Sequence, residues 1–234
     1  MTPERLLSVW EQGVHRHPID RALLMFSLTD SDFKVEQLAD LPLGRCNAAL
    51  MQLHLDYFGG RLAAWLDCPA CGERMEFELD TAQLPPIPVE MVDSIEVDGY
   101  RFRLPTSRHL ARLVNSKNDA QAAARQLLQD CAESTNSLPD EPSRFIELLW
   151  AVEAAVEAED PWTNIALEVC CPACGREDLA DFDIASFLWN KIEHRARQLL
   201  DDTHLLAQAY GWTESDILEM SETRRRAYLA RLQT

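Results

Sequence analysis

The first part of the chain carries the spacing of amphipathic helices. Apolar residues between positions 3 and 28 recur every three or four residues, and Pro18 interrupts the run, so two helices separated near this proline are expected. The Leu-Pro-Leu-Gly sequence at 41–44 breaks the pattern before another amphipathic run, which Gly59-Gly60 ends. The sequence therefore predicts a helical N-terminal region over residues 1–60.

The pattern then changes to the alternation of a strand. Met75, Phe77 and Leu79 alternate with charged residues, as in a half-buried strand, and an apolar segment at 62–66 precedes them. These two segments predict a short hairpin within residues 61–84.

A second hairpin and a helical insertion are predicted within residues 85–160. Asp98-Gly99 lies between two strand-like segments, and this dipeptide readily adopts the positive φ angles of a two-residue turn. Helical spacing follows over residues 107–134, with a break near Asn115, and again over residues 143–158.

The last part of the chain returns from strand to helix. The segment 165–169 is strand-like and is followed by a helical C-terminal region over residues 186–234. Ser186, Thr213 and Ser221 are expected to cap three successive helices in this region, because their hydroxyl groups can accept bonds from the first free N–H groups.

Composition and charge restrict the possible partners. The chain has 234 residues, 47% of them apolar, which is enough to bury a core as one elaborated domain or two small ones. The chain contains 22 Lys and Arg and 39 Asp and Glu. The resulting formal net charge of -17 disfavours binding to phosphate backbones and anionic membranes. No secretory signal and no segment near the ~20 apolar residues of a membrane span is visible. We expect a cytoplasmic protein that binds neutral or basic protein surfaces, with no nucleic acid, membrane or small-molecule substrate.

The cysteines form a repeated motif. Seven cysteines, an odd number, fit metal binding by reduced thiols better than a disulfide framework. Four of them belong to two copies of Cys-Pro-Ala-Cys-Gly, at 68–72 and 171–175, each beside a strand-like segment. The second copy lies 103 positions after the first, and the repeat extends to Asp80 and Asp183. The two copies look like matching halves of one unit.

Two such turns can supply the four sulfurs of one tetrahedral metal site. We assign as ligands the four motif cysteines, Cys68, Cys71, Cys171 and Cys174. Zinc is the expected metal because four thiolates suit it and no redox partner is visible, and iron is the alternative. The 99 residues between the motifs exceed the usual spacing of about 15–20, so the assignment depends on the identical motifs and their flanking strands. Motifs that no longer hold a metal are the competing interpretation.

With this site, the predicted fold class is α+β and mainly helical, with an inserted zinc-ribbon-like β unit between helical N- and C-terminal regions. The predicted segments are 1–60 (helical), 61–84 (first motif), 85–160 (hairpin plus helical insertion), 161–185 (second motif) and 186–234 (helical).

No catalytic apparatus is visible, so the protein is not expected to be an enzyme. The histidines lack metal-motif spacing, and no phosphate-binding glycine loop, nucleophile elbow or dinucleotide fingerprint occurs. A thiol-disulfide oxidoreductase is a competing interpretation, but its motif should open a helix, whereas each copy here follows a strand-like segment. Cys170 is interpreted as a spare thiol, and Cys46 and Cys131 as core residues.

The C-terminal segment combines aromatic residues with the only basic cluster of the chain. Arginine with tryptophan or tyrosine is the usual composition of interface anchors. A partner-binding surface is therefore predicted from Trp212, Arg224, Arg225, Arg226 and Tyr228. The alternative is a solvated helix face that balances nearby acids.

Several short segments at both ends of the chain carry a family resemblance. They are His-Pro-Ile-Asp-Arg-Ala at 17–22, Leu-Pro-Leu-Gly-Arg at 41–45, Phe-Gly at 58–59, the first cysteine motif, and a C-terminal succession of aromatic-rich, Ile-Leu and Arg-Arg-Arg helices. In these the chain resembles the T4-type baseplate protein family of contractile phage tails and phage-tail-like injection systems. Cys46-Asn47 departs from the Arg-Asp expected after Gly-Arg, so a role for that pair does not carry over.

The resemblance implies a structural or assembly protein that is associated with the baseplate and carries no catalytic residues. Its partners would be other tail or baseplate proteins, and it would be either free in the cytoplasm or incorporated in the assembled particle. The alternative is a zinc-ribbon module for protein interaction or nucleic-acid association, which the acidic net charge disfavours in its nucleic-acid form.

Overall fold

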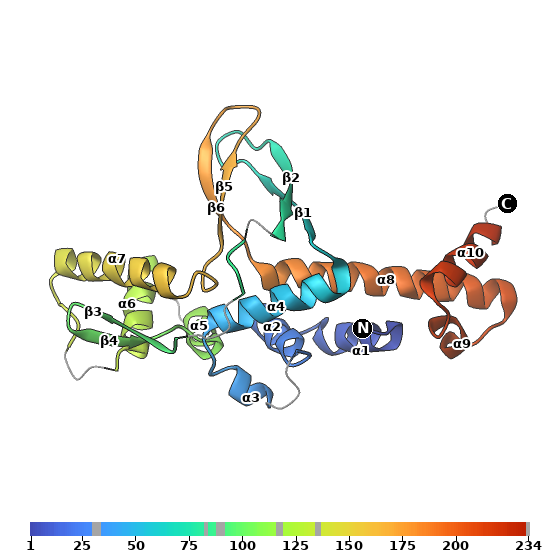
Figure 1. The fold of residues 1–234 in the computed structure, drawn as a ribbon, viewed down its shortest axis with the longest axis horizontal. Coiled ribbons are helices and arrows are strands. Elements are labelled where there is room, and N and C mark those ends of the chain that lie inside the picture. The colour runs from blue at the N-terminus through green and yellow to red at the C-terminus, as the bar shows by residue number, and fades with distance from the viewer. Residues whose placement is uncertain (30–33, 82–83, 88–91, 116–118, 134–136, 233–234) are drawn as a thin grey trace. The chain divides into compact units, whose positions relative to one another are not determined.

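The computed structural model describes residues 1–29, 34–81, 84–87, 92–115, 119–133 and 137–232, and it has the predicted α+β, mainly helical architecture (Figure 1). The chain divides into two compact units, one formed by Met1–Leu24 with Ala185–Thr234 and the other by Met25–Ile184. Among the described residues, no helix combines the length and apolarity that crossing a bilayer requires.

The first unit is built from helices at the two ends of the sequence. In chain order they are α1 (Pro3–Gly13), α2 (Pro18–Phe26), α8 (Ile184–Tyr210), α9 (Glu214–Leu218) and α10 (Glu222–Leu232), of which α2 and α8 extend slightly beyond the unit. Pro18 opens α2, as the predicted break requires. The guanidinium group of Arg21 then donates to the carbonyl groups of Gly13 and Val14, which ties α2 back to the end of α1.

Gly13 is the point at which α1 meets α8. A Cβ atom at this position would lie 2.4 Å from the ring of Trp189, so only glycine permits this approach without displacing the indole. Arg21 also lies over the Trp189 ring, with its guanidinium carbon 4.6 Å from the centroid. The two ends of the chain are thereby packed into one unit.

The predicted helix caps are confirmed at two of three positions. Thr213 accepts from the N–H of Asp216, whose carboxylate accepts in return from the Thr213 N–H, a capping box at the start of α9. Ser221 accepts from the N–H of Arg224 at the start of α10. The prediction for Ser186 is wrong, because α8 already begins at Ile184 and Ser186 lies within its first turn.

The second unit combines six segments of strand with five helices in its described residues. In chain order they are α3 (Val35–Leu38), α4 (Leu43–Phe58), β1 (Arg61–Asp67), β2 (Arg74–Asp80), β3 (Ser94–Val97), β4 (Tyr100–Arg103), α5 (Ser107–Asn115), α6 (Ala120–Cys131), α7 (Pro142–Glu159), β5 (Ala166–Cys170) and β6 (Glu177–Asp181). The strands pair as three antiparallel hairpins, β1-β2, β3-β4 and β5-β6.

The β3-β4 hairpin has the predicted turn and packs against helices. Asp98 and Gly99 have φ angles of 50° and 78°, and Val97 pairs with Tyr100 across the turn. Together with α6 and α7 the hairpin encloses a core whose fully buried centre is Phe102 and Phe145. The burial of these two aromatic rings explains why the insertion between the cysteine motifs folds around a core of its own.

Candidate metal centre

The two cysteine motifs form matching turns at the tips of two hairpins. In the first, the N–H of Cys68 donates to the carbonyl of Glu73 at 2.8 Å, and the N–H of Gly72 donates to the carbonyl of Cys68 at 2.8 Å. The second turn repeats both bonds at the same lengths, with Cys171 and Gly175 as the equivalent residues. The repeat seen in the sequence is therefore a repeat of backbone geometry.

Glycine is needed at the end of each turn because the backbone there is left-handed. Gly72 has a φ of 75° and Gly175 a φ of 70°. A residue with a side chain rarely adopts these angles. The glycine lets the chain reverse directly after the second cysteine, so that both thiols of a motif point to the same side.

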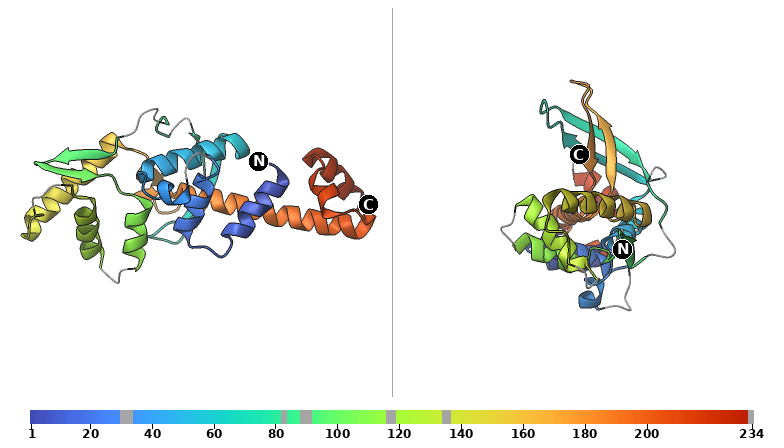
Figure 2. Two further views of the ribbon diagram at one scale, coloured as in Figure 1. Left: turned by 90° about the horizontal axis from the view of Figure 1, so that it is seen from below. Right: turned by 90° about the vertical axis from the view of Figure 1, so that its left-hand side faces the viewer.

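The four motif cysteines come together although their motifs are far apart in sequence. The Sγ atoms of Cys68 and Cys174 are 3.8 Å apart, those of Cys71 and Cys171 are 3.6 Å apart, and all four lie within 4.8 Å of one another. Figure 1 and the right-hand view of Figure 2 show the β1-β2 and β5-β6 hairpins side by side. The predicted ligand set thus forms one cluster, contributed equally by the two hairpins.

The two shortest of these contacts, 3.6 and 3.8 Å, match the dimensions of a tetrahedral thiolate site. A metal–sulfur bond of about 2.3 Å in a tetrahedron separates neighbouring sulfurs by about 3.8 Å. Cys68 and Cys171 are buried, with Met75 as their third core partner, whereas Cys71 and Cys174 are exposed. The cluster can hold a metal ion with one half of its ligand shell inside the hairpin interface and the other half at the surface.

No family model, curated protein or solved structure matches the chain. The candidate site is therefore assigned from its geometry and donor chemistry.

The thiols of the cluster differ in acidity. The N–H groups of Ala70 and Cys71 bond to the sulfur of Cys68 and lower its pKa to about 7. For Cys71, the N–H of Glu73 acts in the same direction, but desolvation and the neighbouring thiols outweigh it and raise the pKa to about 12. Because several thiolates this close together repel one another, all four ionise only with a cation among them, and metal binding is coupled to proton release.

The remaining three cysteines are not part of the metal-binding cluster. Cys46 and Cys131 are buried in helices, as predicted, and desolvation raises the pKa of each thiol to about 12. Cys170 is exposed, and its thiol is 3.9 Å from the carbonyl of Gly175. All seven cysteines fall within the described residues and all are free thiols.

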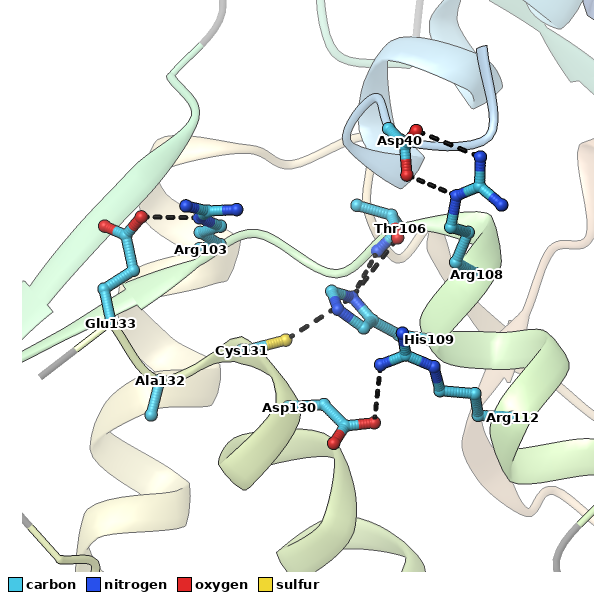
Figure 3. A pocket seen from close by; sticks show the side chains of 10 residues that line it. All are labelled: Asp40, Arg103, Thr106, Arg108, His109, Arg112, Asp130, Cys131, Ala132 and Glu133. Carbon is cyan, nitrogen blue, oxygen red and sulfur yellow. Dashed lines mark hydrogen bonds and ion pairs between the residues drawn. The ribbon is translucent and has the colours of Figure 1, made fainter. Parts of the chain in front are cut away.

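A polar pocket in the second unit was not predicted from the sequence. It has a volume of about 620 Å³ and is lined by Asp40, Arg103, Thr106, Arg108, His109, Arg112, Asp130, Cys131, Ala132 and Glu133 (Figure 3). Its three arginines are each paired with a carboxylate, Arg103 with Glu133, Arg108 with Asp40 and Arg112 with Asp130. Their charges are therefore compensated within the pocket, and no sequence motif marks them because the partners come from separate elements.

His109 in this pocket has a structural role. Its Nδ1 accepts from the N–H of Thr106 at 3.1 Å, which closes the first turn of α5, and burial is the main cause that lowers the pKa of the imidazole. Cys131 approaches the same nitrogen at 3.7 Å. A thiol with a raised pKa beside a neutral imidazole is not an activated nucleophile.

The predicted partner-binding residues all lie in the first unit, but one of them is buried there. Trp212 lies edge-on to Tyr228 at 4.8 Å between ring centroids, and Arg224 lies over the Tyr228 ring at 5.9 Å. Arg226 is exposed and pairs with Glu222. Arg225 needs correction, because it is only 1% exposed and its guanidinium group bonds to Asp202 inside the unit. The three arginines are consecutive on α10, so at about 100° per residue they point in different directions.

Proposed function

We propose that the protein is a structural or assembly component of a contractile phage tail or phage-tail-like injection system, associated with the baseplate, and that the cysteine cluster holds one structural zinc ion. The single observation behind the zinc site is the approach of the four Sγ atoms to within 4.8 Å. The setting in a tail rests on the sequence resemblance at both ends of the chain.

Zinc is the metal that the donor set favours. Four thiolates in tetrahedral arrangement suit zinc, which requires no redox partner, and iron is the principal competitor for the same ligands. A closed four-sulfur site leaves no open position for water, so its role is to stabilise the fold and not to catalyse. The role proposed for the site is therefore structural and not catalytic.

The position of the site explains what the zinc would stabilise. Each hairpin alone has two strands, and an isolated two-stranded hairpin is marginally stable in water. A metal bound by Cys68 and Cys71 from one hairpin and by Cys171 and Cys174 from the other joins segments separated by 99 residues. The enclosed segment, which includes the β3-β4 core, is thereby closed into a loop.

Redox and nucleic-acid roles have less support. Each Cys-Pro-Ala-Cys turn lies between two strands and does not begin a helix. A helix N-terminus is the usual cause of a lowered pKa in a catalytic thiol, and neither of these two turns provides one. A net charge of -17 opposes binding to a phosphate backbone. Protein partners in the cytoplasm, in or out of the assembled particle, fit this charge better.

Deletion of the gene tests the proposed role. In a strain that produces tail particles, we expect loss of the protein to give particles without complete baseplates, as seen by electron microscopy. Expression of the wild-type chain should restore them, and Cys71→Ser should restore fewer. Intact, functional particles in the deletion strain would exclude a required role in assembly.

A further inference from the structure

Helix α7 has one face inside the fold and one face outside it. Phe145, Leu148 and Val152 are buried in the core shared with β3, β4 and α6. Figure 1 shows these elements together. On the opposite side, Trp150 is 65% exposed. An indole in this position contributes little to the core of its own chain, and large exposed aromatic residues are the commonest anchors of protein interfaces.

The charged residues on the same side of α7 as Trp150 are all acidic. Glu147 and Glu153 are three residues from Trp150 along the helix and Glu157 is seven, so all three lie on the same side of α7 as the indole. Within the part of the chain that the structure describes, none of these carboxylates forms an ion pair. From Phe145 to Gly175 the sequence contains no lysine, arginine or histidine.

This arrangement is unfavourable for α7 by itself. Glu153 and Glu157 are four residues apart, a spacing at which like charges repel across one helical turn. Both lie in the C-terminal half of the helix, where the helix dipole favours cations, and the last turn of α7 has no basic residue. The repulsion between these carboxylates and their unfavourable position in the helix dipole are not offset by a cation on the same helix face. Such a helix is a candidate for binding an external cation.

We propose that the exposed face of α7, formed by Glu147, Trp150, Glu153 and Glu157, is the docking site for a basic amphipathic segment of another protein. Trp150 packs against apolar side chains of that segment, and the three carboxylates pair with its lysine or arginine residues. The charge of this face selects the partner, since the α7 face offers only negative groups. This inference does not rest on the proposed role in a tail.

A defined peptide tests the site on the full, metal-loaded chain. The probe is a synthetic amphipathic helix of leucine and lysine, with a leucine and glutamate helix as its counterpart, and binding is measured by isothermal titration calorimetry. We expect only the lysine peptide to bind, and Trp150→Ala and the double variant Glu153→Lys, Glu157→Lys each to weaken its affinity at least about tenfold. The matched control Glu11→Lys, Glu219→Lys changes the net charge equally at exposed positions of the other unit and should weaken it less than about threefold.

The same titrations and two further measurements can overturn the proposal. If the control double variant weakens binding as much as the α7 variant, binding is a general effect of net charge. If Trp150→Ala leaves the affinity unchanged, the indole does not anchor the peptide and the proposed site is wrong. The α7 double variant should have an unchanged or raised melting temperature, and a lower one would show that the carboxylates stabilise the chain itself. Concentration-dependent self-association that Trp150→Ala abolishes in analytical ultracentrifugation would assign the face to a second copy of this chain. None of these readouts depends on particle assembly.

Discussion

Gly44 lies directly against the carboxylate of Asp160, a residue far away in the sequence. A Cβ atom at Gly44 would be 2.0 Å from Oδ1 of Asp160, which is itself only 3% exposed and held by the hydroxyl of Thr163 at 2.6 Å. Beside this contact, the side-chain amide of Asn47 donates to the carbonyl of Trp162 at 2.8 Å. The start of α4 is therefore fitted against the segment that follows α7.

Replacement of this glycine should destabilise the second unit. We expect Gly44→Ala to lower the free energy of unfolding by about 1–3 kcal/mol, because the added methyl group must displace a buried carboxylate. Gly60→Ala is the matched control, since a Cβ there would meet only the Thr81 hydroxyl at 3.3 Å. Urea unfolding followed by circular dichroism measures both. Adding Asp160→Ala to Gly44→Ala should recover part of the loss, and full additivity of the two changes would contradict the steric explanation.

Metal analysis of the protein purified without chelator should find about one zinc ion per chain, because four ligands make one closed site. Inductively coupled plasma mass spectrometry gives the stoichiometry, and the same measurement distinguishes zinc from iron. Two zinc ions per chain would mean that each motif binds separately. A fully reduced protein that takes up no added zinc would show that the motifs have lost their metal.

Loss of a ligand from either hairpin should have the same effect. We expect Cys71→Ser and Cys174→Ser each to destabilise the zinc-loaded protein by more than about 4 kcal/mol, because both open the same site and metal binding is coupled to folding. Cys170→Ser is the control, as this exposed thiol is adjacent in sequence but outside the cluster. Thermal unfolding with and without excess zinc provides the comparison. A large effect in only one of the two ligand variants would separate the hairpins.

The cap formed by His109 should make stability depend on pH. Because burial lowers the pKa of His109, the unfolded chain binds a proton more readily than the folded chain, so this contribution is present above about pH 6.5 and is lost as the pH falls. In His109→Gln the amide oxygen can accept the same bond from Thr106 without titrating. We expect the difference in stability between pH 7.5 and pH 5.5 to be smaller in His109→Gln than in the wild type. An NMR titration that gives His109 a pKa above 6.5 would refute this explanation.

The arginines of α10 should separate into one structural and two surface residues. Arg225→Ala removes the partner of Asp202 from a buried position and is expected to cost about 3–5 kcal/mol. The double variant Arg224→Glu, Arg226→Glu should remain folded, because these side chains are exposed and such ion pairs contribute only about 0–1 kcal/mol each. Differential scanning calorimetry tests both statements. Co-purification of the folded double variant with other tail proteins at wild-type levels would exclude a partner surface at Arg224 and Arg226.

The sequence by itself determined the features that depend on neighbours along the chain. The alternation of apolar and charged residues predicted the hairpin around Cys68. The Asp98-Gly99 dipeptide predicted the β3-β4 turn, and the position of Thr213 before a helical run predicted the cap of α9. Each of these features depends only on residues a few positions away. The shared cysteine cluster was also predictable, since two identical motifs imply two identical turns with the same ligand geometry. Even the error at Ser186 was local, because the helix begins two residues earlier than that hydroxyl group.

Only the tertiary structure decided which faces of these elements are covered. Arg225 looks equivalent to Arg224 and Arg226 in sequence, yet Asp202 on another helix draws it inside the unit. The sequence marks Gly44 only as a helix boundary. The reason that no side chain fits at this position is the adjacent carboxylate of Asp160. Helical periodicity does not specify that Trp150 stays exposed, because burial depends on which distant segments pack against each face. Such contacts join residues whose distance in space is set by the packing of the whole unit and not by their separation along the chain.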